Sequence, residues 1–300
     1  MKNENRVIIP EELAIVEPKK DLLKIINNKQ FKDTILYEKQ SAFHRISVVE
    51  NEIGRFLHYN DTYQAGFIST DEYSGNLPYI NYFLLPYFLN KNLKKILLIG
   101  MGTGLLVKQY ETLFEHLERI DVVDLEENIL DIATKYFNFE PSSKFSFHLQ
   151  DGRIFLRGCK SKYDLIVVDV ANNEGIDARF LEQEYLDEIK SLLKKNGIFV
   201  SNLCSSAHFE HEDNKFLQSV LTLYRDNFAS TLVFKGDTSD KIYYKSFFNI
   251  DERVIDITNL VLISSQGDLS SISDNFNNIN KSKFLEIGVD IESFYGDLYS

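Results

Sequence analysis

The chain has 300 residues, of which 44% are apolar, and can bury a large core in two domains or in one domain with an appendage. Its net charge of −12 argues against nonspecific nucleic-acid binding, which requires a basic surface. The two cysteines, Cys159 and Cys204, have neither metal-binding nor redox spacing and favour a reducing compartment.

The chain lacks the usual signals for secretion or membrane insertion. Residues 1–6 have no apolar core of a secretion signal, and the most apolar segment, residues 79–89, is too short to span a bilayer. We therefore expect a soluble cytoplasmic protein that binds neither membrane nor nucleic acid.

The beginning of the chain predicts a small antiparallel sheet. A short helix is expected around residues 11–28, and strands are expected at 34–38, 43–49 and 54–59, separated by polar turns. The segment 73–89 is predicted to be helical, and its aromatic residues favour core packing over ligand binding.

From Lys95 onward, strand and helix patterns alternate, which implies a mainly parallel sheet with helices on both faces. Strands are predicted at 95–99, 119–124, 145–149, 163–169 and 197–203, with helices at about 104–117, 126–137, 152–157 and 180–194.

The remainder of the chain predicts a helix around 214–225 and a hairpin formed by 230–234 and 241–248 at the sheet edge. A polar connection over 264–282 leads to a C-terminal helix. We expect a segment with a small β domain at 1–72, a nucleoside-binding catalytic domain at 73–263, and the polar connection with its helix at 264–300.

The most informative motif is an apolar run from Lys95 that ends in three alternating glycines, Gly100, Gly102 and Gly104. Such a run is typical of a buried strand that turns sharply into a helix, with a backbone that a ligand can approach closely. Asp124 is the last residue of the next apolar run. It follows the glycines at the sequence separation at which nucleotide-binding units place a ribose-binding carboxylate.

Four predicted strand ends carry polar groups: the glycine turn, Asp124, Asp151 and Asp169. Parallel sheets bind ligands at this edge, so we expect these groups to share one site. Asp124 can accept hydrogen bonds from both ribose hydroxyls, and Asp151 from the exocyclic amine of adenine. Each acid taken alone also fits a helix N-cap, and for Asp151 both interpretations stay open.

Together these motifs resemble the spermidine synthase (polyamine aminopropyltransferase) family, a branch of the class I methyltransferase-like superfamily. The similarity runs from about Ile35 to Phe248. It is carried by residues 35–48, Gln64, 71–73, the glycine turn, 123–126, 136–137, 150–156, 163–169 and 196–199.

The resemblance implies a seven-stranded Rossmann-like α/β sheet, preceded by a small antiparallel β domain. It implies S-adenosylmethionine or its decarboxylated form as co-substrate, an amine-bearing acceptor and a homodimer. Asp169 would be the catalytic base, and residues 170–180 would cover the acceptor. The nucleoside would be held by Gln64, Gly100, Gly102, Thr103, Gly104, Asp124, Leu125, Asp151 and Gly152, and the acceptor pocket would include Asp71, Tyr73 and Asn172.

A metal site is not expected. His208 and His211 have helical spacing, but no third histidine is nearby, and a solvated helix start explains them better.

The sequence departs from the family where the substrates' amines are recognised. Thr103 replaces an Asp that pairs with the donor's amine, and Asn172-Asn173 replaces an Asp-Pro pair. His44 replaces a Gln, Asn60-Asp61 replaces an Asp-Gly, and residues 73–77 replace a Tyr-His-Glu. Because charged hydrogen bonds contribute roughly 1.5–3 kcal/mol each, putrescine should bind weakly. Thr103 carries no charge to repel a carboxylate, which makes S-adenosylmethionine itself a candidate donor.

We therefore predict a spermidine synthase-like transferase that moves an aminopropyl or related alkyl group. The alternatives are an S-adenosylmethionine-dependent methyltransferase and an inactive ligand-sensing or interaction protein of the same fold.

Overall fold

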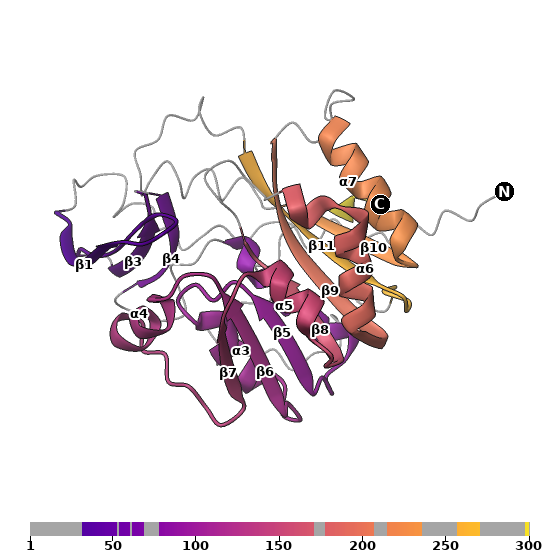
Figure 1. The fold of residues 1–300 in the computed structure, drawn as a ribbon, viewed down its shortest axis with the longest axis horizontal. Coiled ribbons are helices and arrows are strands. Elements are labelled where there is room, and N and C mark those ends of the chain that lie inside the picture. The colour runs from indigo at the N-terminus through magenta and orange to yellow at the C-terminus, as the bar shows by residue number, and fades with distance from the viewer. Residues whose placement is uncertain are drawn as a thin grey trace, which may run out of the picture.

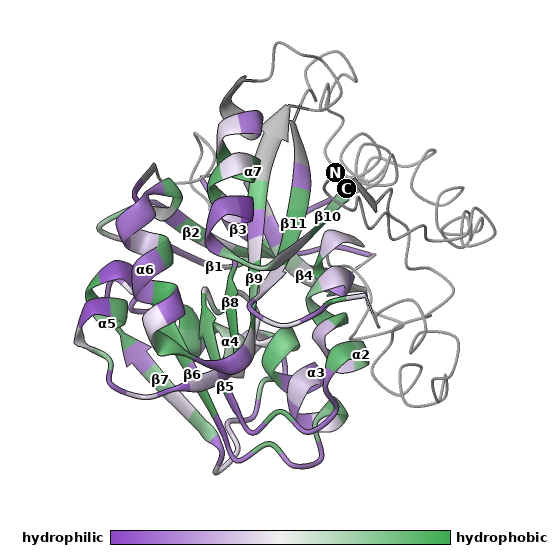
Figure 2. Ribbon diagram, turned by 90° about the vertical axis from the view of Figure 1, so that its right-hand side faces the viewer, coloured by the Kyte–Doolittle hydropathy of each residue, from purple (hydrophilic) through white to green (hydrophobic). Residues whose placement is uncertain are grey.

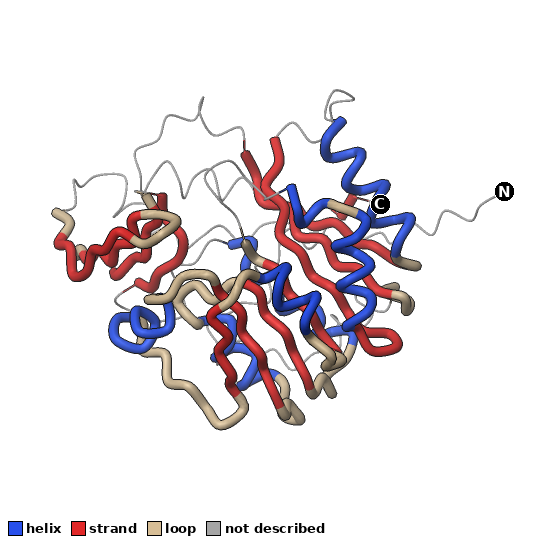
Figure 3. Tube along the Cα trace, viewed as in Figure 1, coloured by secondary structure: helices blue, strands red, loops and turns tan. Residues whose placement is uncertain are grey.

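The structure is a computed structural model that describes residues 32–52, 54–60, 62–68, 78–170, 178–206, 215–235, 257–270 and 298–299. Two sheets organise these residues, a four-stranded antiparallel sheet and an eight-stranded mixed sheet (Figures 1 and 3). The expected domain boundary near residue 72 and the expected helix at 11–28 lie outside the described residues.

The small sheet has the order β1-β2-β3-β4 and consists of β1 (Thr34–Gln40), β2 (Arg45–Glu50), β3 (Gly54–Tyr59) and β4 (Thr62–Ile68). The three predicted strands are confirmed, but β4 was missed. Tyr59 pairs with Thr62, so the chain reverses over two residues, and Asn60 has a φ of 47° there. Asn tolerates this left-handed conformation and favours such tight hairpins, a signal that could have revealed β4.

The large sheet has the order β12-β10-β11-β9-β8-β5-β6-β7. Its parallel strands are β5 (Lys95–Ile99), β6 (Arg119–Asp124), β7 (Phe145–Leu149), β8 (Tyr163–Val168) and β9 (Leu193–Ser206). These five strands confirm the predicted ones, because strands buried on both faces have nearly continuous apolar sequences. With the antiparallel β10 (Ser230–Lys235) and β11 (Ile257–Ser265), the sheet has the expected seven strands plus the two-residue β12 (Leu298–Tyr299).

The C-terminal region of the sheet differs from the prediction. Strand β10 pairs along its whole length with β11, and β11 also pairs with β9. The segment 241–248, predicted as the partner of 230–234, and the C-terminal helix lie outside the described residues. The polar connection was predicted to start at residue 264. This start is wrong, because Ser264 and Ser265 are buried at the end of β11. The run Leu260–Ile263 was a strand signal that the polar residues around it obscured.

Helices cover both faces of the large sheet. They are α2 (Pro86–Leu89), α3 (Leu105–Leu113), α4 (Ile129–Tyr136), α5 (Gly152–Gly158), α6 (Gln183–Leu192) and α7 (Lys215–Asn227), with the 3-10 helices η2 (Pro78–Leu84) and η3 (Ala178–Leu181). Instead of the single helix predicted over 73–89, the described residues of this segment form η2 and α2. Each of these short helices begins at a proline, which has no N–H to continue a preceding helix.

Successive side chains of β5 point to opposite faces of the large sheet and contribute to two hydrophobic cores, one on each face. Ile96 and Leu98 pack with η2, α2, α3, α4 and the small sheet, whereas Leu97 and Ile99 pack against α5, α6 and α7. Figure 2 shows the apolar strands between helices whose other faces are hydrophilic. Within the described ranges, every helix falls short of the length and apolarity that a membrane crossing requires.

Candidate functional site

The glycine turn after β5 forms the floor of the site. Gly100, Gly102 and Gly104 have φ values of 99°, 54° and 81°, which other residues rarely adopt. A Cβ at Gly100 would lie 2.2 Å from the carbonyl oxygen of Asp169, and one at Gly104 would lie 2.7 Å from the ring of Phe139. A Cβ at Gly102 would have no atom within 4 Å. Two glycines are therefore needed for packing, and Gly102 is the one whose backbone borders open space.

Asp124, at the end of β6, lies directly against this turn. Its Oδ2 accepts a hydrogen bond from the backbone N–H of Met101 at 2.8 Å, and its Oδ1 accepts one from the N–H of Glu126 at 2.8 Å. Burial raises the pKa of Asp124, and these backbone hydrogen bonds partly offset that effect. A carboxylate has about four acceptor positions, so the two oxygens can still accept further hydrogen bonds.

Asp151, after β7, has two roles in the structure. Its Oδ1 caps α5 by accepting from the N–H groups of Arg153 at 2.9 Å and Ile154 at 3.0 Å. Its Oδ2 lies 3.3 Å from Nη1 of Arg179. The N-cap interpretation is therefore confirmed for one oxygen, and the other oxygen is paired with a guanidinium.

Asp169, at the end of β8, is the most perturbed acid of the site. Asn202 Nδ2 donates to its Oδ1 at 3.0 Å, and the Tyr79 hydroxyl lies 3.4 Å from each carboxylate oxygen. Burial raises the pKa of Asp169 to about 6, although the hydrogen bonds from Asn202 and Tyr79 lower it. A carboxylate with this pKa can act as a general base near neutral pH.

Asn202 and Tyr79 were not among the site residues predicted from the sequence. Asn202 is a buried amide in the apolar strand β9, and its Nδ2 also lies 3.2 Å from Oδ1 of Asn259. A polar residue within a buried strand was the available signal for Asn202. Tyr79 was placed with the core aromatics, and its ring does pack against Phe83 at 5.7 Å.

The small sheet borders the same edge. The ring of His44 stacks on Tyr59 at 3.9 Å, and its Nε2 lies 3.4 Å from Oε2 of the buried Glu126. Lys39 Nζ also bonds to Glu127 at 3.0 Å. In the sequence His44 was notable only as a departure from the family, and no role was predicted for Glu126.

The remaining predicted residues are distributed around this rim. Thr103 is buried, Gly152 is the first residue of α5, and Gln64 is half-buried in β4. Leu125 is 41% exposed, and with Leu149 and Ile154 it forms a set of exposed apolar side chains beside Asp124 and Asp151 in the sequence. Asp71, Tyr73 and Asn172, the segment 171–177, and His208 and His211 lie outside the described residues.

Parallel pairing places the ends of β5, β6, β7 and β8 at one edge of the sheet. Strand β5 lies between β6 and β8, so the order reverses there, which is where open α/β sheets bind ligands. Backbone hydrogen bonds join these strand ends. The N–H groups of Gly100, Asp169 and Gln150 donate to the backbone carbonyl oxygens of Val123, Ile99 and Asp124, respectively. Among the described residues, no group of three or more His, Cys, Asp or Glu side chains could hold a metal ion.

The strand order and this edge define a Rossmann-like α/β protein with a ligand-binding edge at the strand ends. Comparison with known proteins gives the family: the sequence model of the spermine/spermidine synthase domain matches residues 83–236. The chain belongs to the spermine/spermidine synthase family.

The similarity to curated relatives covers only a portion of each chain. A polyamine aminopropyltransferase of Vibrio vulnificus (strain CMCP6) is 30% identical over 189 residues, or 60% of this chain and 62% of the relative. A polyamine aminopropyltransferase of Clostridium botulinum (strain Alaska E43 / Type E3) is 28% identical over 184 residues, or 60% of this chain and 62% of the relative. The chain thus spans about three fifths of the length of these relatives.

Solved structures support the fold. Spermidine synthase from Thermotoga maritima has a TM-score of 0.62 at 18% identity, covering 87% of this chain and 81% of that one. A spermidine synthase in complex with the transition state analogue AdoDATO has a TM-score of 0.63 at 18% identity, with 87% and 82% covered. A probable spermidine synthase from Corynebacterium glutamicum has a TM-score of 0.65 at 16% identity, covering 86% of this chain and 89% of that one.

Proposed function

We propose that this protein transfers an aminopropyl or related alkyl group from a sulfonium nucleoside to an amine-bearing acceptor. The observation that carries the proposal is the position of Asp169. Its carboxylate, with a pKa of about 6, contacts Tyr79 and Asn202, and its backbone packs against Gly100 in the glycine turn.

The donor side of the site fits a nucleoside. Open space at Gly102 allows a ligand to approach the main chain, and Asp124 presents a carboxylate at the adjoining strand end for the ribose hydroxyls. The exposed Leu125, Leu149 and Ile154 offer apolar surface for a base. The curated relatives are named polyamine aminopropyltransferases, and a sulfonium nucleoside that carries an aminopropyl group is decarboxylated S-adenosylmethionine, which we take as the first candidate donor.

The chemistry requires one base and good alignment. The acceptor nitrogen attacks the carbon attached to sulfur, a C–N bond forms and the C–S bond breaks. The electron pair of that bond remains on sulfur, which becomes a neutral thioether. Asp169 accepts the proton that the nitrogen loses, while Tyr79 and Asn202 hold its carboxylate in place.

Thr103 favours a second candidate donor. In this family an Asp at its position pairs with the donor's amine, and the uncharged Thr103 would tolerate a carboxylate nearby. S-adenosylmethionine itself could then bind, and the transferred group would be a methyl or an aminocarboxypropyl group. The mass of the product distinguishes these groups.

The test combines binding with turnover. Calorimetry with methylthioadenosine, S-adenosylmethionine and decarboxylated S-adenosylmethionine should give heat with at least one of them. Mass spectrometry after incubation with putrescine and other amines should then identify an alkylated amine. Absence of binding to all three nucleosides would defeat the proposal.

Asp169→Asn separates an enzyme from an inactive ligand-sensing protein. We expect this variant to bind the nucleoside and lose turnover by about 10²–10⁴-fold. The control is Asp187→Asn, which removes a comparable charge from the exposed side of α6. Binding without any turnover in the wild-type protein would support the sensing alternative. A homodimer, expected from the family, would be tested by sedimentation.

A further inference from the structure

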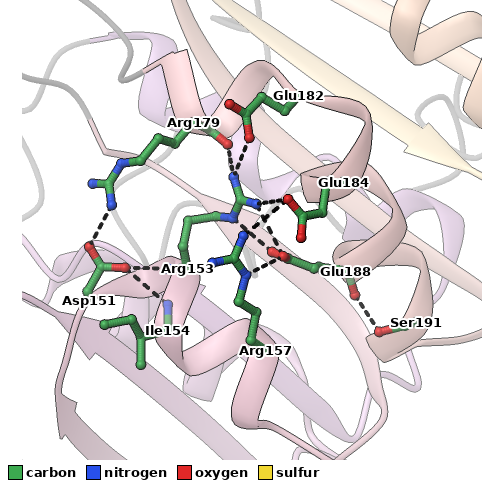
Figure 4. Close-up of polar contacts among 9 residues, drawn as sticks. All are labelled: Asp151, Arg153, Ile154, Arg157, Arg179, Glu182, Glu184, Glu188 and Ser191. Atoms are coloured by element: carbon green, nitrogen blue, oxygen red, sulfur yellow. Dashed lines mark hydrogen bonds and ion pairs between the residues drawn. The ribbon is translucent and has the colours of Figure 1, made fainter.

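The carboxylate of Asp151 belongs to a closed ring of polar contacts with Arg153 and Arg179 (Figure 4). Its Oδ1 accepts from the backbone N–H of Arg153, at 2.9 Å. The guanidinium of Arg153 donates to the carbonyl oxygen of Arg179. The side chain of Arg179 returns to Oδ2 of Asp151, at 3.3 Å. Backbone N–H groups thus hold one oxygen of this carboxylate, and the side chain of Arg179 contacts the other.

Arg153 makes this ring rigid. Its side chain is only 3% exposed, and it forms a bidentate pair with Glu188, through Nε at 2.8 Å and Nη2 at 3.1 Å. Its guanidinium also lies 5.4 Å from the centre of the Tyr185 ring. Because a buried guanidinium held in this way has little freedom, the start of α5 and the backbone of η3 are fixed relative to each other.

The ring places a donor beside an acceptor at the edge of the nucleoside site. Oδ1 of Asp151 is occupied by two backbone N–H groups, so Oδ2 is the oxygen available to a ligand. The guanidinium next to it belongs to Arg179, which is 54% exposed and therefore accessible from solvent. Asn and Gln recognise adenine with just such an adjacent donor and acceptor, which bond to a ring nitrogen and to the exocyclic amine.

We propose that Arg179 is a specificity-determining residue of the nucleoside site. Oδ2 of Asp151 accepts from the exocyclic amine of the purine, and Arg179 donates to an adjacent ring nitrogen. Arg153 is the positioning residue, because it holds the backbone of Arg179 at this distance from Asp151. This inference rests on the proposed nucleoside site and adds a second contact to its base.

Calorimetry on the full chain tests the contact. The probes are methylthioadenosine and two analogues in which CH replaces the N1 or the N7 ring nitrogen. In the wild-type protein, one analogue should bind about five- to tenfold more weakly than methylthioadenosine, the effect of one lost hydrogen bond. Arg179→Ala should weaken methylthioadenosine binding by a similar factor and should abolish the difference between that analogue and methylthioadenosine.

Arg157→Ala is the matched control. Arg157 contacts the same Glu188 at 2.7 Å and is 53% exposed, so the variant removes an equal charge from the same cluster. It should retain both the affinity and the discrimination. Equal or tighter binding of methylthioadenosine by Arg179→Ala would overturn the inference, as would an unchanged discrimination. If the wild-type protein bound none of methylthioadenosine, S-adenosylmethionine and decarboxylated S-adenosylmethionine, the proposed function itself would be defeated, and with it this inference.

Arg153→Lys tests the positioning role. Lysine keeps the charge but lacks the planar fork that contacts Glu188 and the Arg179 carbonyl together. Well below the melting temperature of the variant, discrimination between methylthioadenosine and the affected analogue should fall towards that of Arg179→Ala. A loss of stability alone would not change this ratio. Full discrimination in Arg153→Lys would show that Arg153 does not position Arg179.

Discussion

Gly100 packs directly against the main chain of Asp169, so that a Cβ at Gly100 would lie 2.2 Å from the Asp169 carbonyl oxygen. The contact joins the glycine turn after β5 to the acid at the end of β8. The same turn is joined to Asp124 through the N–H of Met101. Any side chain at Gly100 therefore displaces the proposed base from the proposed nucleoside site.

Alanine substitutions should separate packing from binding in this turn. Gly100→Ala should lower the melting temperature strongly, because its methyl group would overlap backbone. Gly102→Ala meets no protein atom within 4 Å and should cost only about 1–2 kcal/mol, from its positive φ. It should nevertheless weaken methylthioadenosine binding by about tenfold or more. Thermal melts and calorimetry on both variants provide the check, and unchanged affinity in Gly102→Ala would contradict a ligand at this position.

Activity should depend on the ionisation of Asp169. Because the pKa of Asp169 is about 6, turnover at saturating substrate should rise as the pH increases through 6 and then level off with respect to this group. A pH–rate profile measures the effect. A flat profile between pH 5 and pH 7 would argue against Asp169 as the base.

The same pKa predicts a stability difference with a defined sign. Asp169 titrates near 6 in the folded protein and near 3.8 in the unfolded chain, so the folded state binds more protons between these values. The unfolding free energy therefore falls as the pH rises through this range, by up to about 3 kcal/mol. Asp169→Asn should melt at a higher temperature than wild type at pH 8, and the advantage should shrink towards pH 4. Equal melting temperatures at pH 8 would contradict the raised pKa.

Asp124→Asn should damage both the turn and the site. Each carboxylate oxygen accepts a hydrogen bond from a backbone N–H, of Met101 and of Glu126, whereas an amide accepts only through its oxygen and places an NH2 donor where the second oxygen was. We expect a loss of about 1–3 kcal/mol of stability. Methylthioadenosine affinity measured below the melting temperature should also fall. Asp131→Asn, which alters an exposed acid at the start of α4, should change neither quantity.

His44 should make the fold sensitive to mild acid. Burial lowers the pKa of His44, although the charge of Glu126 raises it. Since the folded pKa lies below that of the unfolded chain, the unfolded chain binds more protons as the pH falls through about 6.5, and stability decreases there. In thermal melts from pH 7.5 to 5.5, His44→Gln should lose less stability than wild type. The exposed His116→Gln should follow wild type, and a parallel decline in all three proteins would refute the expectation.

Short-range patterns were sufficient for most of the large sheet. Strands β5, β6 and β7 have the predicted ends, because an apolar run closed by Gly or Asp is a strong local signal. Strand β11 was missed because its apolar run, Leu260–Ile263, is short and lies between polar residues. Strand β4 contains Gly66, whose Cβ position would overlap Arg55 and Phe56, so a close backbone contact interrupts the expected pattern.

The side chains that surround each acid could not be predicted in this way. Asn202 bonds to Asp169 across 33 residues of sequence, Tyr79 across 90, and Arg179 bonds to Asp151 across 28. No periodicity links such positions. Each contact depends on how β9, η2 and η3 pack against the parallel strands.

Local sequence patterns were enough to define the parallel sheet, the glycine turn and the acids at successive strand ends, because backbone geometry ties these features to runs of apolar residues and glycine. Which groups those acids contact became visible only in three dimensions. The helix cap on one oxygen of Asp151 is local and was one of the two interpretations open from the sequence, whereas packing placed a guanidinium on the other oxygen and enclosed Asp169 enough to raise its pKa. Hydrogen bonding and desolvation depend on neighbours in space, and the fold brings those neighbours from distant segments of the chain.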